Sequence, residues 1–189
     1  MLELATIPYQ RALVADWSAL GNASLSIRER RGSGAAVLKV GRRVALPLDS
    51  ALPAPNTWRQ SGDAQWLWQG PREWLAISDS VDSKTMIAQT SPLTSGITAT
   101  MVDVADRVLG LEVTGTNAAP LLASGTSLDP RRLAPGACCR TRFAALAVTI
   151  VIASTDGSFT LIADRASGVY LYSWLQRAIA NLATTHVAS

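Results

Sequence analysis

Asp103 and Asp106, in the stretch VDVADR, are the residues of this sequence that come closest to an acid–base site. Two carboxylates three residues apart can divide acid and base roles when burial separates their pKa values. Arg107 follows directly and offers charge neutralisation, which favours an ordinary turn at the end of a strand. We therefore predict an ordinary turn here and no catalysis by this chain alone.

Histidine and cysteine chemistry is limited by the number and position of these residues. The one histidine, His186, lies near the end of the sequence, where chains commonly fray, so a Ser-His-Asp or Cys-His site is not expected. Cys138 and Cys139 are adjacent, and neighbours on a strand point to opposite faces. We expect buried strand thiols rather than a redox pair, in a reducing cytoplasm. These three residues do not supply a zinc-ligand spacing, and we predict no metal site in this chain.

The stretch GSGAAV at residues 32–37 resembles a dinucleotide fingerprint but lacks the third glycine and the helix that should follow. The arginines around it could contact phosphate, yet Glu29 interrupts them and no aromatic residues lie between them. The pattern favours a solvated hairpin or a rim for an acidic partner, and the net charge of +3 argues against nucleic-acid binding. The arginines are Arg28, Arg30, Arg31, Arg42 and Arg43.

The composition is that of a globular protein on the apolar side. Of the 189 residues, 48% are hydrophobic and 16% are charged, so part of the surface must be apolar and could face a partner. The longest apolar stretch, FAALAVTIVIA, is about eleven residues, well short of the ~20 needed to span a bilayer. The first residues lack the pattern of a signal peptide. We expect no membrane association and a cytoplasmic location.

Period-two alternation and turn residues predict a series of strands. They lie in SLSIRER, AAVLKV, RRVALPL, AQWLWQ and EWLAIS, in GITATMVDVADRVLGLEVTG on both sides of Asp106, and in ACCRTRFAALAVTIVIAS and SFTLIAD around the turn TDG. Helices are predicted in SVDSKTMIAQTS and in TNAAPLLASG, where Thr116 is the expected cap. The last helix has an apolar stripe of Val169, Tyr172, Leu175, Ala178, Ile179 and Leu182.

This order of elements predicts an α+β fold: a mostly antiparallel sheet with short helices and a C-terminal amphipathic helix. We expect a single domain over residues 1–189. Residues 1–60 are predicted to be a loosely attached N-terminal part, and residues 61–185 are predicted to be the core.

Three of the six tryptophans lie in WLWQGPREWLAIS, at residues 66–78. On the two predicted strands, Trp66 and Trp68 share one face, and Trp74 shares a face with Ala76. The opposite faces are apolar as well, which is typical of strands covered on both sides. GPR has the residues of a turn. The run could be a ligand platform of indole rings or two core strands. The family resemblance described next favours the core over an interface for Trp66 and Trp74, and for Trp68 it favours both equally.

Three stretches taken together resemble the gamma subunit family of heterotetrameric sarcosine oxidase. They are WLWQGPREWLAIS, the run from MVDVADR to TIVIAS, and FTLIADRASGVYLYSWLQRA, covering about residues 60–180. The family's Trp-x-Gly-Pro-x-Glu-Trp-Leu element is met by Trp68, Gly70, Pro71, Glu73, Trp74 and Leu75. A Val-Asp-Val segment at residues 102–104, a Gly-bounded helix at 115–125, an L-x-P-G-x-C-x-R-T turn at 133–141 and a closing aromatic helix with Tyr172, Trp174 and Leu175 follow in order.

The resemblance implies a fold like one module of the folate-binding aminomethyltransferases. It implies a non-catalytic subunit of an oxidoreductase complex that oxidises sarcosine to glycine and passes the one-carbon unit to tetrahydrofolate. In such a complex the alpha subunit holds NAD and a folate-binding domain, beta holds FAD and FMN, and delta holds zinc. No cofactor is expected in this chain. Its role would be to assemble and stabilise the flavin-bearing subunits, its partners being alpha, beta and delta.

The residues that the resemblance marks are structural. They are Trp68, Gly70, Pro71 and Trp74 in the turn, Asp103 in the sheet, and Arg140 and Arg142 beside it. The alternative is a free-standing folate-dependent one-carbon transfer protein, with Asp103 or Asp79 near the pterin. One departure bears on it: aminomethyltransferases usually carry an Asn-Ala pair where this chain has Ser78-Asp79.

Overall fold

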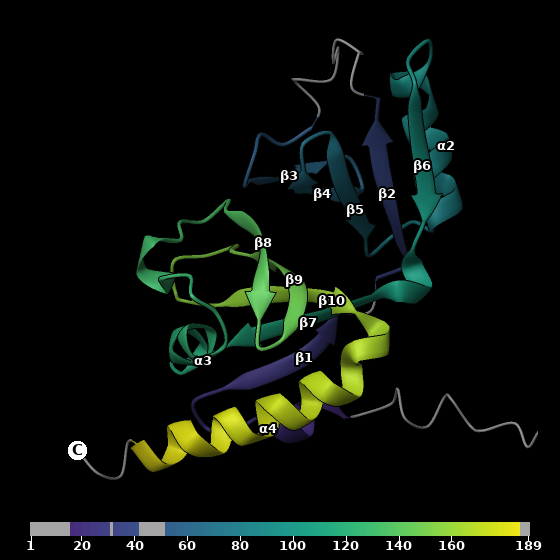
Figure 1. The fold of residues 1–189 in the computed structure, drawn as a ribbon. Helices are drawn as coiled ribbons and strands as arrows, with labels where there is room; N and C mark the ends of the chain where they lie inside the picture. The colour runs from purple at the N-terminus through teal and green to yellow at the C-terminus, as the bar shows by residue number, and fades with distance from the viewer. Residues whose placement is uncertain (1–15, 31, 42–51, 186–189) are drawn as a thin grey trace, which may run out of the picture.

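The computed structural model describes residues 16–30, 32–41 and 52–185, which form two five-stranded antiparallel sheets (Figure 1). The first sheet has the order β1-β7-β10-β9-β8, and the second has the order β3-β4-β5-β2-β6. The first sheet consists of β1 (Ser26–Arg30), β7 (Val108–Thr114), β10 (Phe159–Asp164), β9 (Leu146–Val151) and β8 (Cys138–Phe143). The second consists of β3 (Trp58–Ser61), β4 (Ala64–Gly70), β5 (Glu73–Ser78), β2 (Gly34–Val40) and β6 (Ala99–Asp103).

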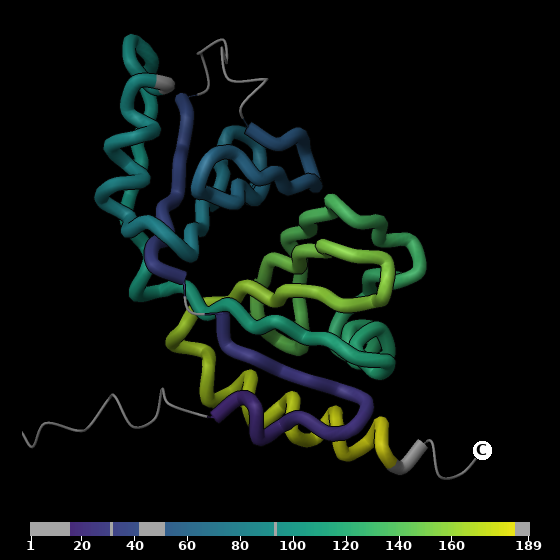
Figure 2. Tube along the Cα trace, turned by 180° about the vertical axis from the view of Figure 1, so that it is seen from behind, coloured from purple at the N-terminus to yellow at the C-terminus, as the bar shows by residue number. Residues whose placement is uncertain are grey.

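The helices cover the outer faces of the two sheets, as Figures 1 and 2 show from opposite sides. The short helix η1 (Trp17–Leu20), α3 (Ala118–Gly125) and α4 (Gly168–Thr185) pack on the first sheet, where Leu121, Leu171 and Leu175 are fully buried. The helix α2 (Ser83–Thr94) packs on the second sheet. A third apolar cluster, which includes Leu67 and Ile162, lies between the sheets. The predicted α+β fold is confirmed, with two sheets in place of one.

The central strands of the second sheet are buried on both faces, as the tryptophan-rich sequence predicts. Trp66 and Trp74 point to the cluster under α2, while Leu67 and Leu75 point to the cluster between the sheets. The sheet accepts α2 at close range because β2 starts with a glycine: a Cβ at Gly34 would collide with backbone atoms of residues 81–83. Both clusters exclude water from large side chains, which supplies most of the driving force for this packing.

Two chain segments cross from one sheet to the other. β1 belongs to the first sheet, whereas β2 lies between β5 and β6 in the second. In the same way β6 is linked through η2 (Ala105–Arg107) to β7. The described part of residues 1–60 is therefore hydrogen-bonded into both sheets. The strand predicted in RRVALPL and the residue His186 lie outside the described residues.

The helices match the predicted segments but differ in detail. Asn117 rather than Thr116 precedes α3, and its side chain makes no capping hydrogen bond. In α4 the buried stripe runs through Leu171 and Leu175, one turn apart, whereas the predicted stripe residue Val169 is 54% exposed. Among the described helices, none combines the length and the apolar character needed to cross a membrane.

Candidate functional site

The β4–β5 hairpin places four of the predicted site residues at one end of the second sheet. Trp68 lies opposite Trp74, and Gly70 lies opposite Glu73, with a bulge between Trp68 and Gly70. The exposed Pro71 and the adjacent Arg72 form the predicted turn, in which Arg72 has a left-handed φ of 63°. The Arg72 guanidinium donates a hydrogen bond of 2.8 Å to the Gly41 carbonyl, which ties the turn to the end of β2.

The tryptophans of this hairpin lie mainly in the core of the chain itself. Trp66 and Trp74 are each 5% exposed, and the Trp74 indole N–H donates to the Pro53 carbonyl at 3.1 Å. Trp68 is half-buried against the same cluster. The structure therefore confirms the core assignment of Trp66 and Trp74, and it leaves part of the Trp68 ring open to solvent.

The hairpin also contacts β8 of the first sheet, which brings Arg140 to it. The Arg140 guanidinium donates to the Gln69 carbonyl at 3.5 Å and lies 3.9 Å from the Glu73 carboxylate. The Cys138 thiol donates to the Trp68 carbonyl at 3.4 Å. Arg142, two residues further along β8, is exposed and lies opposite Ala147. Of the two predicted arginines, the structure brings Arg140 to the hairpin.

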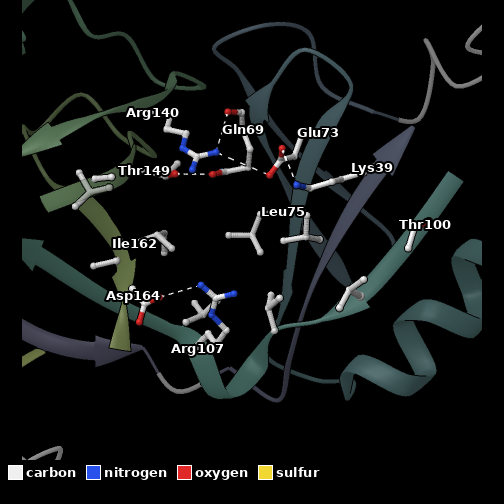
Figure 3. A pocket seen from close by; sticks show the side chains of 17 residues that line it. Lys39, Gln69, Glu73, Leu75, Thr100, Arg107, Arg140, Thr149, Ile162 and Asp164 are labelled. Carbon is white, nitrogen blue, oxygen red and sulfur yellow. Dashed lines mark hydrogen bonds and ion pairs between the residues drawn. The ribbon is translucent and has the colours of Figure 1, made fainter. Parts of the chain in front are cut away.

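A cavity of about 510 Å³ opens between the two sheets beside this contact (Figure 3). We refer to it as the inter-sheet cavity. Its walls are apolar, with Val37 and Leu75 from the second sheet and Val148 and Ile162 from the first. Thr100, Val102 and Val104 line it on the β6 side. Binding sites are often concave and largely apolar with a few polar groups, so this cavity is the candidate functional site.

Ion pairs lie at two ends of the inter-sheet cavity (Figure 3). At one end Glu73 lies 3.4 Å from the Lys39 ammonium and 3.9 Å from Arg140, so one carboxylate is shared by two cations. At the other end Arg107 and Asp164 are 3.1 Å apart. The backbone N–H of Ala166 and the Arg107 guanidinium lower the pKa of Asp164, which keeps it ionised. Arg107 therefore neutralises Asp164 rather than Asp103 or Asp106, a correction to the sequence prediction.

Asp103 lies at the end of β6, away from the hairpin. Its side chain is exposed and accepts a hydrogen bond of 2.9 Å from the Ala105 N–H. This hydrogen bond lowers the pKa of the Asp103 carboxyl. The ionised Asp103 carboxylate closes the turn into η2, and Asp103 is not among the residues lining the cavity.

Of the arginines around GSG, Arg30 connects the two sheets through side-chain hydrogen bonds. Its guanidinium donates to Asp79 at 2.9 Å and to the side-chain carbonyl of Gln65 at 2.6 Å, so it links β1 with the second sheet. Arg28 is exposed. The remaining three arginines lie outside the described residues.

The cysteine thiols are poorly suited to nucleophilic chemistry. Burial raises the pKa of the Cys138 thiol to about 12, and burial also raises the pKa of Cys139. The thiolate is the reactive form, so both side chains are largely protonated at neutral pH. Both cysteines are free. Within residues 16–30, 32–41 and 52–185, no three His, Cys, Asp or Glu side chains are grouped to hold a metal ion.

Sequence reasoning missed the charged residues of the cavity: Lys39, the cavity-facing role of Glu73, and the Arg107–Asp164 pair. Lys39 and Glu73 are register partners in β2 and β5, strands that are far apart in the sequence. No local sequence pattern predicts this pairing, although Glu73 belongs to the Trp-x-Gly-Pro-x-Glu-Trp-Leu element of the β4–β5 hairpin.

Comparisons with known proteins identify a family and a similar fold. The model of the sarcosine oxidase gamma subunit family matches residues 32–181. The fold is similar to a chain of heterotetrameric sarcosine oxidase from Corynebacterium sp. U-96, with a TM-score of 0.74 and 18% identity, over 89% of this chain and 92% of that one. It is also similar to glycine cleavage system aminomethyltransferase T from Bartonella henselae, with a TM-score of 0.61 and 14% identity, over 84% of this chain and 47% of that one. Among curated proteins no relative matches the sequence.

Proposed function

The chain belongs to the sarcosine oxidase gamma subunit family, and we propose that it serves as a non-catalytic subunit of a sarcosine oxidase complex. In this role it binds the flavin-bearing subunits and stabilises their assembly. The observation that carries the proposal is the family match over residues 32–181, together with a fold that covers 92% of one chain of a heterotetrameric sarcosine oxidase.

The partners in this proposal are the alpha, beta and delta subunits. Together they hold FAD, FMN, NAD, zinc and tetrahydrofolate, and they oxidise sarcosine to glycine while passing the one-carbon unit to the folate. This chain supplies no cofactor ligand in the proposal. Its contribution is binding energy, because a subunit that associates only with the assembled state stabilises that state.

Two features of the chain support an assembly role. The first is the low charged fraction of 16%, a composition that favours apolar surface for contact with a partner. The second is the inter-sheet cavity, whose apolar walls and charged ends resemble the surface that a partner covers. Neither feature identifies the partner, and that identification comes from the family.

Co-expression tests the proposal. The tagged chain would be produced with and without the candidate alpha, beta and delta subunits, and the products would be compared by gel filtration with detection at flavin wavelengths. We expect the chain to elute in a yellow complex that consumes oxygen when sarcosine is added. The matched control is the same three subunits without this chain, which should assemble poorly. Partners that assemble and work equally well without the chain would contradict the proposal.

A free-standing folate-dependent one-carbon transfer protein is the second candidate. The fold similarity to aminomethyltransferase T favours it, although this chain spans about half of that protein's length. It requires saturable binding of tetrahydrofolate by the isolated chain, which calorimetric titration measures. Asp79→Ala and Asp103→Ala would weaken that binding if these carboxylates lay near the pterin.

A further inference from the structure

β6 is an edge strand of the second sheet in the part of the chain that the structure describes. Among those residues it pairs with β2 alone, in the register Val37↔Val102 and Lys39↔Thr100. Two flanking hydrogen bonds, from the Gly41 N–H to the Thr98 carbonyl and from the Val104 N–H to the Ala35 carbonyl, show which residues face β2. Backbone groups alternate in direction along an antiparallel strand. The N–H and C=O groups of Ala99, Met101 and Asp103 therefore point away from β2.

This edge carries few of the features that usually protect edges. Proteins commonly block an exposed edge with a lysine, a proline or a bulge. The β6 sequence is ATMVD, with no proline and no lysine, and its one charge is at the end. Val102 is 53% exposed, one of the exposed large hydrophobic residues of the described chain. An edge strand of this kind can pair, through main-chain hydrogen bonds, with an extended segment of another chain.

The inter-sheet cavity adjoins the same edge. Thr100 and Val102 of β6 line the cavity. Figure 3 shows Thr100 on the β6 side and Ile162 on the opposite side, with Leu75 between them. Alternate side chains of a strand point to the same face of its sheet. A strand added beyond β6 would therefore direct every second side chain to the cavity side, where Val102 and its neighbours favour an apolar residue.

The charges around the cavity favour an acidic partner residue. Lys39, Arg107 and Arg140 supply three positive charges, while Glu73 and Asp164 supply two negative ones. The surplus lies at the Lys39–Arg140 end, where the single Glu73 carboxylate faces both cations. A carboxylate from a partner would complete the second pair there.

We propose that a partner subunit of the complex adds an extended segment to the free edge of β6, placing an apolar side chain in the inter-sheet cavity, and that a carboxylate of the same partner, outside the paired strand, lies near Lys39 and Arg140. Main-chain hydrogen bonds to Ala99, Met101 and Asp103 supply the pairing, and the cavity selects the side chains. This inference rests on the proposed function, because it names the surface through which the subunit binds its partners.

The test compares two valines of equal exposure. Val102→Lys places an ammonium over the apolar cavity, and Val169→Lys makes the same change on α4, where Val169 is 54% exposed beyond the far face of the first sheet. Affinity would be measured by titrating immobilised partner subunits with each tagged chain. We expect Val102→Lys to bind at least about tenfold more weakly than the wild type, and Val169→Lys to bind as the wild type does.

Ala99→Pro tests the main-chain part of the proposal. It removes an outward N–H but none of the hydrogen bonds to β2, and proline is tolerated at such an edge position. Thermal melting monitored by circular dichroism would verify that each variant is folded. We expect the folded Ala99→Pro chain to lose affinity as Val102→Lys does.

The possible failures are distinguishable. Wild-type affinity in folded Val102→Lys and Ala99→Pro, or equal weakening in Val169→Lys, would overturn the assignment to β6 and leave the subunit role intact. A concentration-dependent dimer of the isolated chain that Ala99→Pro abolishes would overturn the partner assignment in favour of a second copy. A wild-type chain that binds none of the three subunits would instead refute the proposed function itself.

Discussion

Trp68 and Trp74 lie directly opposite each other across the β4–β5 hairpin, yet their surroundings differ. Trp74 is 5% exposed, and its indole N–H donates to the Pro53 carbonyl. Trp68 packs against the same cluster while part of its ring remains open to solvent. One tryptophan therefore stabilises the fold of this chain, and its neighbour is also available to a partner. An aromatic ring whose one polar group is hydrogen-bonded packs well both in a protein core and at an interface with a partner.

Trp74→Ala should destabilise the chain far more than Trp68→Ala. Removing a buried tryptophan leaves a cavity and an unpaired carbonyl at Pro53, and we expect a loss of roughly 3–5 kcal/mol in the free energy of unfolding. Urea unfolding of the isolated chain, followed by circular dichroism, measures both variants against the wild type. A Trp74→Ala chain that stays soluble, retains wild-type stability and still enters the complex would contradict the structural role assigned to Trp74.

Two glycines singled out in the sequence should respond differently to alanine. A Cβ at Gly34 would collide with the backbone that leads into α2, whereas a Cβ at Gly70 would meet no atom within 4 Å. Backbone atoms cannot move aside as a flexible side chain can. We therefore expect Gly34→Ala to lower the free energy of unfolding by roughly 1–3 kcal/mol or more. Gly70→Ala should change the melting temperature little. Equal melting temperatures for the two variants would show that α2 does not depend on close approach to β2.

The strands could be predicted from the sequence because their signals are local. The alternation in AQWLWQ and EWLAIS, with GPR between them, specifies a hairpin covered on both faces, and the structure has that hairpin. Gly34 is also explained by its immediate surroundings. GSGAAV is not a nucleotide-binding loop, but its second glycine, which has no Cβ, lets the start of α2 pack closely against β2. Local chemistry identifies an element and its turn without information from distant residues.

The sorting of strands into two sheets could not be predicted, since it depends on pairing between distant segments. β1 pairs with β7, while β2, four residues further along the chain, pairs with β5 and β6. The partner of Arg107 depends on the same sorting: Asp164 arrives on β10, fifty-seven residues away. The residues of the inter-sheet cavity come from both sheets, so the cavity exists only once the sheets have packed.

Alkaline pH should destabilise the chain through Cys138. Burial raises the pKa of this thiol from 9.0 to about 12. The unfolded chain therefore loses this proton at a lower pH than the folded chain does, so stability that is fully present below pH 9 is lost as pH rises toward 12. The slope is about 1.4 kcal/mol per pH unit for one group. Urea unfolding under reducing conditions would measure the free energy of unfolding at about pH 8 and about pH 10.5. Between these pH values the wild type should lose about 2 kcal/mol more of it than Cys138→Ala does. Equal losses would show that Cys138 is not the titrating group.

Arg140 and Arg142 provide a matched pair for testing the charged end of the cavity. Both are exposed on β8, but only Arg140 approaches Gln69 and Glu73. Exposed ion pairs contribute little to folding, so neither Arg140→Ala nor Arg142→Ala should change the unfolding transition appreciably. If a partner carboxylate binds near Arg140, Arg140→Ala should weaken binding to the partner subunits severalfold, and Arg142→Ala should not. The wild-type affinity should also fall as salt rises from roughly 50 mM to roughly 500 mM, more steeply than that of Arg140→Ala. Identical affinities and salt slopes for all three chains would place the partner's charges elsewhere, because screening acts on the pair only when both charges are present.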